Sequence, residues 1–255
     1  MNAVDGSLPR ERQQWILDRL RRDGRVVATD LAQAFRVSDD SIRRDLRDLA
    51  AQGLCRRVYG GALLAQPVAP LGERHHERAE LKRALAGVAA SLVGEKQILF
   101  IDAGSTNTAL AHALPERRGL TVVTNAPDVA MAVLGRPGFD VLMLGGRLDP
   151  HIGGAIGSRT VRQAQDIRAD LCFPGVCAID AASGLWTVDA EETVFKQVII
   201  EASGETVAIA TPDKLVASAT HHTASIGAIT HLVVSADTSD AAMAAYRNAG
   251  VAVHR

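Results

Sequence analysis

Residues 37–49 of the chain read Val-Ser-Asp-Asp-Ser-Ile-Arg-Arg-Asp-Leu-Arg-Asp-Leu, and this stretch decides the nature of the N-terminal part. On a helix with about 100° between successive residues, Ile42, Leu46 and Leu49 lie within about 60° of one another. They form the apolar stripe of a helix that packs on a neighbour. Ser38 is a good N-cap, and the two aspartates after it suit the positive end of the helix dipole.

The opposite side of this helix is basic. Arg43, Arg44 and Arg47 fall at about 100°, 200° and 140° from Ile42. Arginine can fork onto a guanine edge or clamp a phosphate, so this face suits a DNA recognition helix. Taken alone, three arginines on a helix are more often a solvated face, and the interpretation depends on the neighbouring segments.

Those segments complete a small domain. We expect a helix from Pro9 to about Asp23 and a short helix over residues 30–35 capped by Thr29. After the recognition helix, which Gly53 stops, residues 54–64 predict a hairpin that turns near Tyr59. A short helix, a tight turn, a Ser-capped helix and a basic hairpin predict a winged helix-turn-helix.

The distribution of charge agrees with a DNA-binding N-terminus. Residues 1–64 hold 12 Arg against 9 Asp and Glu, a net charge of +3, whereas the remainder is −4. A basic module on an acidic body suggests that one end meets a polyanion. No apolar run approaches a membrane span and Met1–Arg10 lacks a signal core, so we expect a cytoplasmic protein with no membrane partner. The three cysteines are widely spaced and predict neither disulfides nor a metal site.

The rest of the chain has a different pattern of apolar and polar residues. Residues 65–72, with two prolines, predict a linker, and an Ala- and Leu-rich helix follows over roughly 77–93. Beyond it, wholly apolar runs alternate with helical stretches, which is typical of a mainly parallel sheet covered on both faces. The expected strands are 98–101, 120–123, 141–144, 171–176, 206–209, 231–234 and 251–253, and the expected helices are 108–114, 127–134, 191–202 and 239–248.

Polar residues follow several of these strands. Because ligands bind at the strand-end loops of open parallel sheets, we expect an anion site there, made by the loop after residue 101, a glycine turn and a helix N-terminus. A plain capped turn is an equally good interpretation of that loop alone, and Arg147 and Lys214 could be surface charges. The candidate ligand residues are Asp102, Gly104, Ser105, Thr106, Asn107, Thr108, Thr124, Asn125, Gly145, Gly146, Arg147 and Lys214.

Two segments, residues 37–46 and 53–62, resemble the signature of the DeoR family of bacterial regulators. Small departures are Ser41, where Thr is usual, and Cys55, where an aliphatic residue is common. The resemblance extends from about Glu73 to the C-terminus and implies an α/β sensor domain of the ribose-5-phosphate isomerase/CoA transferase-like type. It implies a phosphorylated sugar or related metabolite as effector, no cofactor, and a homodimer or homotetramer.

Other departures lie near the expected pocket. The family usually has Asp where Thr211 stands, three residues before Lys214, and Asp213 is a candidate substitute although Pro212 alters the loop. Ala178 stands where Gly is frequent. These changes leave open the effector's identity and the roles of Lys214 and Asp180. On the helix after Trp186, Glu191, Glu192 and Lys196 are plausible pocket or interface groups, with a solvated face the alternative for at least one.

The expected organisation is a winged helix-turn-helix over residues 1–64, a linker over 65–76 and a sensor over 77–255. We expect a transcriptional regulator, in most such proteins a repressor, of a carbohydrate operon. Its partner is double-stranded operator DNA, contacted by Ser38, Ser41, Arg43, Arg44, Arg47, Arg56, Arg57 and Tyr59.

The alternative function is an active sugar-phosphate isomerase or deaminase. Asp102, Asp180 and Glu192 suit a catalytic acid or base by type, but their spacing indicates no catalytic pair. A purely structural DNA binder would have no use for the sensor domain.

Overall fold

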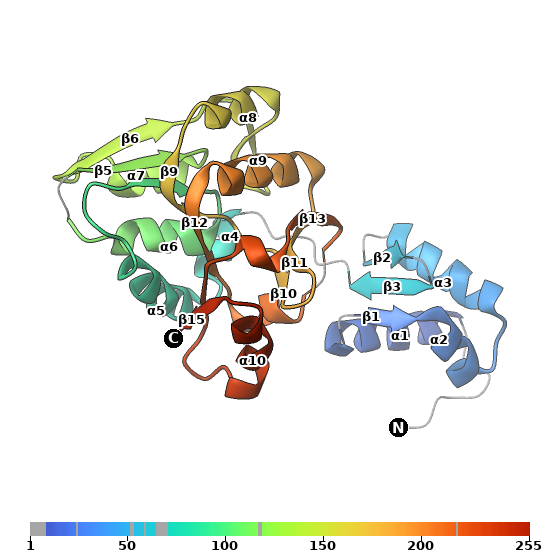
Figure 1. Ribbon diagram of the computed structural model, residues 1–255. Helices are drawn as coiled ribbons and strands as arrows, with labels where there is room; N and C mark the ends of the chain where they lie inside the picture. The colour runs from blue at the N-terminus through green and yellow to red at the C-terminus, as the bar shows by residue number, and fades with distance from the viewer. Residues whose placement is uncertain are drawn as a thin grey trace. The chain divides into compact units, whose positions relative to one another are not determined.

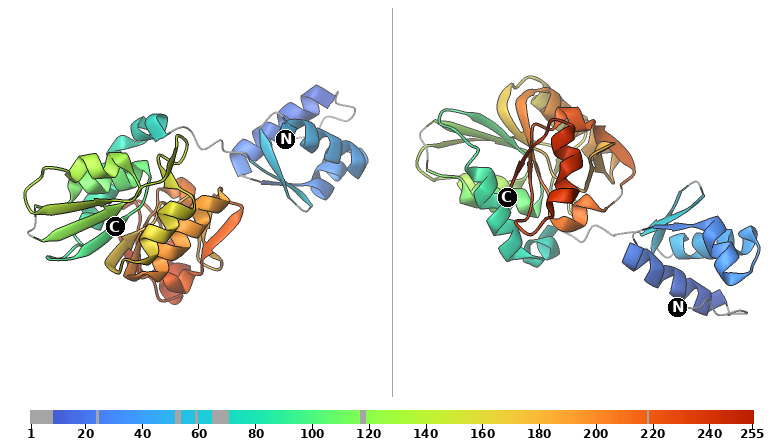
Figure 2. Two further views of the ribbon diagram at one scale, coloured as in Figure 1. Left: turned by 90° about the horizontal axis from the view of Figure 1, so that it is seen from above. Right: turned by 60° about the horizontal axis from the view of Figure 1, so that its bottom comes forward.

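The structure is a computed structural model that describes residues 9–23, 25–51, 54–58, 60–64, 71–116, 119–217 and 219–255. The chain divides into two compact units, Met1–Val68 and Ala69–Arg255. Figure 1 labels their helices and strands, and Figure 2 shows the same ribbon from two further sides.

The N-terminal unit has three helices and a small antiparallel sheet in its described residues. Its elements are α1 (Pro9–Asp23), β1 (Arg25–Val27), α2 (Ala28–Phe35), α3 (Asp39–Ala51), β2 (Cys55–Val58) and β3 (Gly61–Leu64). The strands have the order β1-β3-β2. The expected helices and hairpin are present, and β1, which extends the hairpin to three strands, was not expected.

One core holds this unit together. Ile42, Leu46 and Leu49 of α3 are buried together with Ile16 and Leu20 of α1, so the predicted apolar stripe faces inward. Burying side chains of this size contributes about 1.5–3 kcal/mol each.

The expected cap of the second helix is wrong. α2 begins at Ala28 rather than at Asp30, and its N-cap is Val27, which has no side-chain cap. The N–H group of Ala28 instead donates to the carbonyl of Gly60 in the hairpin turn, at 2.7 Å. A backbone contact with the hairpin thus supplies an acceptor at the N-terminus of α2, where the sequence predicted a cap by the Thr29 side chain. The expected Ser38 cap of α3 is confirmed, since the Ser41 N–H group donates to Ser38 Oγ at 3.3 Å.

A buried ion pair fixes α3 against α1. Asp45 and Arg12 have side chains only 3% and 9% exposed, and Arg12 Nε lies 2.5 Å from Asp45 Oδ2. Gln13 Nε2 also donates to Asp45 Oδ1, at 3.3 Å. Asp45 thus joins α3 to two residues of α1.

The C-terminal unit is built on a seven-stranded sheet. Its helices are α4 (Leu71–His76), α5 (Ala79–Ala90), α6 (Ser105–Ala113), α7 (Pro127–Val133), α8 (Ser158–Gln165), α9 (Ala190–Glu201) and α10 (Asp240–Asn248), with short 3₁₀ helices η1 (Pro212–Leu215) and η2 (Ile226–Ala228). The sheet contains β4 (Ile98–Ile101), β5 (Leu120–Thr124), β6 (Phe139–Met143), β9 (Ala169–Phe173), β12 (Ser203–Ile209), β14 (His231–Val233) and β15 (Ala252–His254).

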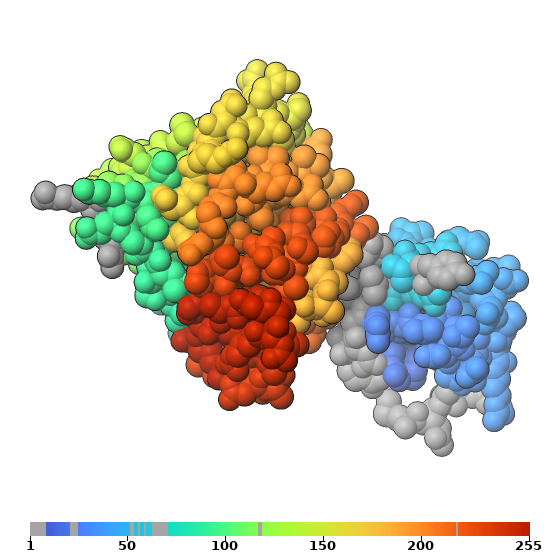
Figure 3. Space-filling view, viewed as in Figure 1, coloured from blue at the N-terminus to red at the C-terminus, as the bar shows by residue number. Residues whose placement is uncertain are grey.

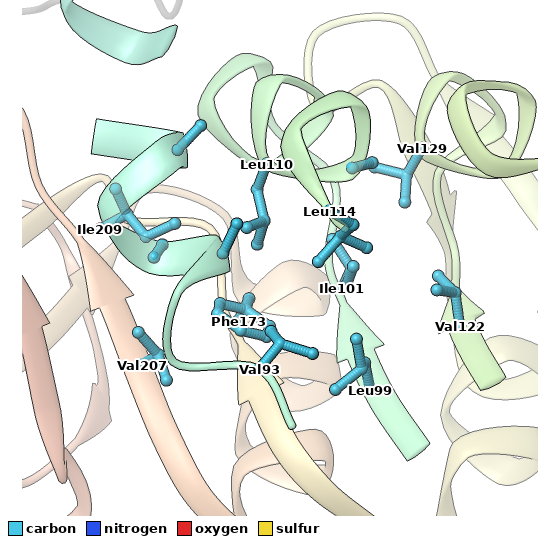
Figure 4. Packing of buried hydrophobic residues seen from close by; sticks show 14 of the residues in the cluster. Val93, Leu99, Ile101, Leu110, Leu114, Val122, Val129, Phe173, Val207 and Ile209 are labelled. Atoms are coloured by element: carbon cyan, nitrogen blue, oxygen red, sulfur yellow. The ribbon is translucent and has the colours of Figure 1, made fainter. Parts of the chain in front are cut away.

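The sheet is parallel throughout and has the order β15-β14-β12-β9-β4-β5-β6. Helices α5, α6 and α7 cover one face and α8, α9 and α10 the other (Figure 1). Figure 3 shows the C-terminal residues, coloured red, on the side of this unit that faces the viewer. Within β9, Leu171 and Phe173 point into the first core while Cys172 points into the second. Strands buried on both sides explain the unbroken apolar runs of the sequence. Figure 4 shows the first core, with Phe173 among the labelled side chains.

Some expectations for this unit need correction. The expected linker reached residue 76, but its last six residues form α4, whose Leu71 is buried. Short antiparallel strands not foreseen from the sequence are β7 (Arg147–Asp149), β8 (Gly154–Ile156), β10 (Ala178–Asp180), β11 (Gly184–Thr187) and β13 (His221–Ala224). Strands of three or four residues leave too short a pattern to distinguish from a loop.

The Arg12–Asp45 pair gives a first prediction. Asp45→Ala leaves the Arg12 guanidinium buried without its carboxylate, so we expect the unfolding free energy of the N-terminal unit to fall by about 3–5 kcal/mol. Urea denaturation followed by Trp15 fluorescence measures it. Asp48→Ala, on the exposed side of α3, is the control and should change stability by less than about 0.5 kcal/mol. Equal effects of the two substitutions would show that the buried pair does not hold α3.

Candidate DNA-binding surface and ligand site

The outer side of α3 is a basic surface. Arg43, Arg44 and Arg47 are all exposed, and within the described residues their side chains form no hydrogen bond or ion pair. Ser38 and Ser41 sit at the start of the same helix with their hydroxyl oxygens 3.0 Å apart. The packed stripe holds the helix while these side chains project from it, which is the arrangement used to contact base edges and phosphates.

The hairpin contributes a second basic group. Arg57 on β2 is exposed. Tyr59 and the side chain of Arg56, which we also expected to contact DNA, lie outside the described residues. A guanidinium on the hairpin suits contact with the DNA backbone, where affinity depends on salt.

The sheet of the C-terminal unit has a topological switch point between β4 and β9. From β4 the chain proceeds outward through β5 to β6, and then returns to β9 on the other side of β4 before continuing to β12, β14 and β15. The loops that leave β4 and β9 therefore run to opposite sides of the sheet, and this topology predicts a ligand crevice at the carboxyl edge between them.

The loop after β4 presents unused donors at this crevice. Gly104, with φ of 149°, is the N-cap of α6, and no atom lies within 4 Å of where its Cβ would stand. The first N–H groups of a helix have no acceptor inside it. Within the described residues, no hydrogen bond is formed by the backbone N–H groups of Ser105, Thr106 and Asn107. The same is true of the hydroxyls of Ser105 and Thr106. Free N–H groups at a helix N-terminus beside open space favour an anion.

Other predicted ligand residues hold the loops in place. Asn107 Nδ2 donates to the carbonyls of Asp102 and Phe173 at 3.0 and 2.8 Å, which ties the ends of β4 and β9 together. Asn125 Oδ1 accepts from the Ala103 N–H group at 3.1 Å. Thr124 and Thr108 hydroxyls are bonded to nearby backbone groups. These side chains are buried and shape the loop; their contact with ligand stays a prediction.

A buried cation lies beneath the switch point. Lys196 of α9 is fully buried, and its Nζ atom lies 2.5 Å from Asp102 Oδ2 and 2.6 Å from Glu192 Oε1. Burial by itself would lower the pKa of Lys196, but Asp102 and Glu192 outweigh it and raise the pKa above its ordinary value. Asp102 Oδ2 also accepts from the Gly175 N–H group at 2.8 Å, and a Cβ at Gly175 would stand 2.6 Å from the Ala103 carbonyl oxygen. The charged lysine thus joins α9 to both loops of the crevice.

Gly145, Gly146 and Arg147 belong to a neighbouring surface. Gly145 lines a hollow of about 580 Å³ beside α8, and Gly146 and Arg147 line another of about 430 Å³. Arg147 is 64% exposed and pairs with Glu191 at 3.2 Å. The structure therefore places these predicted ligand residues beside α8, and their share in one site with Gly104 stays a prediction.

Lys214 lies on η1, close to a carboxylate. Its Nζ atom is 3.4 Å from Asp213 Oδ2, and Asp213 also pairs with Arg78. Burial would raise the pKa of Asp213, but the Thr211 hydroxyl, Lys214 and Arg78 together hold it below its ordinary value. With Thr211 in place of the usual Asp, Asp213 is the carboxylate that pairs with Lys214 in this loop.

Asp180 has a different role from a pocket group. It lies at the end of β10 and accepts hydrogen bonds from the Ala182 N–H group, the Ser183 N–H group and the Ser183 hydroxyl, at 3.1, 2.9 and 2.8 Å. The Ser183 hydroxyl is the main reason that the pKa of Asp180 is lowered. Asp180 closes the β10–β11 turn, while the two other acidic candidates for catalysis, Asp102 and Glu192, are both paired with Lys196.

Comparison with known proteins identifies the chain. The family model of the DeoR-like helix-turn-helix domain matches residues 12–68, and the model of the DeoR C-terminal sensor domain matches residues 77–236. The chain belongs to the DeoR family. This regulator is 34% identical to the glycerol-3-phosphate regulon repressor of Escherichia coli K12 over 195 residues, which cover 76% of this chain and 77% of the relative. It is 29% identical to a putative aga operon transcriptional repressor of E. coli O157:H7, over 95% and 92% of the two chains.

The DeoR-family chain is a DNA-binding transcriptional regulator and not an enzyme. Ribose 5-phosphate isomerase A of Neisseria gonorrhoeae resembles it with 20% identity and a TM-score of 0.40 over 54% of each chain, a likeness too weak to support a conclusion. Across the described residues, no helix has the length and apolar character that crossing a membrane requires. In the same residues no three His, Cys, Asp or Glu side chains are grouped to hold a metal ion.

The arginines of α3 give a prediction for DNA binding. Arg43→Ala and Arg44→Ala should each weaken binding to a duplex selected by the wild-type regulator by about 1–3 kcal/mol, because each removes a candidate base or phosphate contact. Fluorescence anisotropy across a salt series separates the two kinds of contact, since losing a phosphate contact reduces the salt slope by about 1. Arg83→Ala, an exposed arginine of the sensor unit, is the control. Unchanged affinity in both α3 variants would exclude this face.

Lys196 gives a prediction for stability. Lys196→Met leaves two buried carboxylates without their cation, so the unfolding free energy of the sensor unit should fall by about 3–5 kcal/mol. The triple variant Asp102→Asn, Glu192→Gln, Lys196→Met removes the charges together and should recover part of the loss.

Because its pKa is raised, Lys196 contributes fully to stability below its unfolded pKa of about 10.5, and its contribution is lost only as pH rises through the higher folded-state value. The difference in unfolding free energy between the wild type and Lys196→Met should therefore stay constant between about pH 6 and pH 9.

Proposed function

We propose that this DeoR-family regulator represses a carbohydrate operon and responds to a phosphorylated sugar or polyol bound at the switch point of its sensor sheet. The observation that carries the proposal is the set of unpartnered donors around Gly104, at the N-terminus of α6 and beside open space. Phosphate oxygens suit those N–H groups, and hydroxyls of a sugar suit Ser105 and Thr106. The relatives named as repressors of the glycerol-3-phosphate regulon and the aga operon support this class of effector.

The proposed DNA contacts come from Ser38, Ser41, Arg43, Arg44 and Arg47 of the recognition helix, with Arg56, Arg57 and Tyr59 of the hairpin along the backbone. Each chain carries one such helix. A dimer or tetramer would place two or more of them in successive major grooves of a repeated or palindromic operator, about 34 Å apart.

The proposed ligand residues are Gly104, Ser105, Thr106 and Lys214, shaped by the buried set Asp102, Asn107, Thr108, Thr124 and Asn125. Lys214 would supply a positive charge in addition to the N–H groups of α6. Gly145, Gly146 and Arg147 would contact the part of a larger ligand that extends toward α8. An effector acts only through its preference for one arrangement of the protein; a coupling of about 1–3 kcal/mol changes operator affinity roughly 5–150-fold.

Ligand binding is tested by a thermal-shift screen. Glycerol 3-phosphate, hexose phosphates, amino-sugar phosphates and inorganic phosphate are each added to the full chain, since a compound that binds the native state raises its melting temperature. Thr106→Val and Lys214→Ala should abolish the shift of the active compound while DNA binding is retained. Arg147→Ala should reduce the shift only for compounds long enough to reach α8. Full shifts in both the Thr106 and Lys214 variants would exclude the switch-point site.

A further inference from the structure

The segment that enters the sensor unit from residues 65–70 is bound to several of its strand-end loops. We call residues 71–78, which comprise α4 and the turn after it, the strap. The two family models match residues 12–68 and 77–236, so residues 71–76 of the strap lie between the two matches. Its contacts begin with Leu71, which is buried, and end with Arg78.

One end of the strap packs on the β7–β8 turn. A Cβ at Gly153 would stand 2.1 Å from Leu71 Cδ2, so the leucine occupies the space that this glycine leaves. Arg74 donates to the carbonyls of His151 and Ile152, the latter at 3.2 Å.

That turn is two hydrogen bonds away from the loop of Gly104. Asn125 Nδ2 donates to the Ala155 carbonyl at 3.0 Å, and Asn125 Oδ1 accepts from the Ala103 N–H group at 3.1 Å. The β7–β8 hairpin, whose turn holds Leu71 and Arg74, is thus connected to the proposed anion site through Asn125.

The other end of the strap is tied to α7 and η1. His75 Nε2 lies 2.9 Å from Asp128 Oδ2 on α7. Arg78 pairs with Asp213, the same carboxylate that lies 3.4 Å from the ammonium of Lys214. One carboxylate therefore serves both the strap and the lysine proposed to bind the effector.

Cations outnumber anions around this carboxylate. Lys82 of α5 is buried and donates to the Arg74 carbonyl at 2.5 Å. Its pKa is lowered chiefly by burial and further by the nearby charges of Arg74 and Lys214, against the opposite effect of Glu77 and Asp213. Crowded cations of this kind are stabilised by any additional anion, and a phosphate brings more negative charge than a carboxylate.

We propose that the phosphate of the effector, once held by Lys214, takes Arg78 from Asp213 and so changes how the strap is held on the sensor unit. The inference rests on the proposed function, because it needs an anion at Lys214. A phosphate beside Lys214 repels the Asp213 carboxylate and offers the exposed Arg78 guanidinium a bidentate partner. Since the strap continues directly into residues 65–70, the exchange of partners reaches the DNA-binding unit through the chain itself.

Asp213→Asn tests the proposal by removing the carboxylate that the anion would displace. In the full-length variant without ligand, amide hydrogen exchange in residues 71–78 should be faster than in the wild type, because Arg78 has lost its anchor. Glycerol 3-phosphate and inorganic phosphate, measured by calorimetry, should bind with equal or higher affinity. In the wild type, glycerol 3-phosphate should change operator affinity by a factor in the range of about 5–150, which is typical of such coupling. In Asp213→Asn this factor should fall to less than about a third of its wild-type value.

Asp140→Asn, which removes an exposed carboxylate from β6, is the matched control and should behave as the wild type in all three measurements. Wild-type exchange in residues 71–78 together with an unchanged operator response in Asp213→Asn would overturn the proposal. If neither phosphate probe binds the wild type, the proposed function fails for these compounds. The exchange measurement still decides whether Asp213 holds the strap: faster exchange supports the anchor and unchanged exchange refutes it.

Discussion

The sensor unit depends on the buried ammonium of Lys196, which lies between the carboxylates of Asp102 and Glu192 at 2.5 and 2.6 Å. The order in which the chain adds strands to the parallel sheet reverses between β4 and β9, and a ligand crevice is expected where the two loops diverge. Asp102 closes the base of that crevice by accepting from Lys196 and from the Gly175 N–H group. Three charges in a dry site are costly unless all are satisfied, so this arrangement restricts where the loop around Gly104 can go.

The N-terminal unit solves a similar problem with one ion pair. Asp45 and Arg12 are buried between α3 and α1, and they fix the rotation of the recognition helix about its own axis. The apolar stripe through Leu46 selects the face of α3 that is buried, and the ion pair adds a specific contact that ties this face to α1. With that face buried, Arg43, Arg44 and Arg47 are exposed as a group, which a DNA-binding face needs.

Within the sensor unit, the loop around Gly104 and the strap differ in how firmly their polar groups are held. Around Gly104 the buried amides Asn107 and Asn125 each form hydrogen bonds with two backbone groups, which fixes the shape of the loop. The strap is held at its far end by the partly exposed pair of Arg78 and Asp213, with side chains 53% and 31% exposed. Partly exposed ion pairs contribute little to stability, so their exchange for another anion is cheap in free energy. In the mechanism that we propose, this contrast lets the loop around Gly104 stay in place while the contacts of the strap change.

The sequence by itself determined the winged helix-turn-helix, the outward face of α3 and the parallel sheet, because each follows from local periodicity. It also identified Asp102 to Gly104 as a strand-end loop, whereas Ser105 to Asn107, expected before the helix, lie in the first turn of α6. Only the tertiary structure decided that Asp102 and Lys196, 94 residues apart, share a buried site. It likewise decided that α2 is capped by a contact with Gly60 in place of Thr29, and that residues 71–76 are a helix of the sensor unit instead of linker. Such features depend on which distant atoms meet after folding, and no spacing in the chain encodes them.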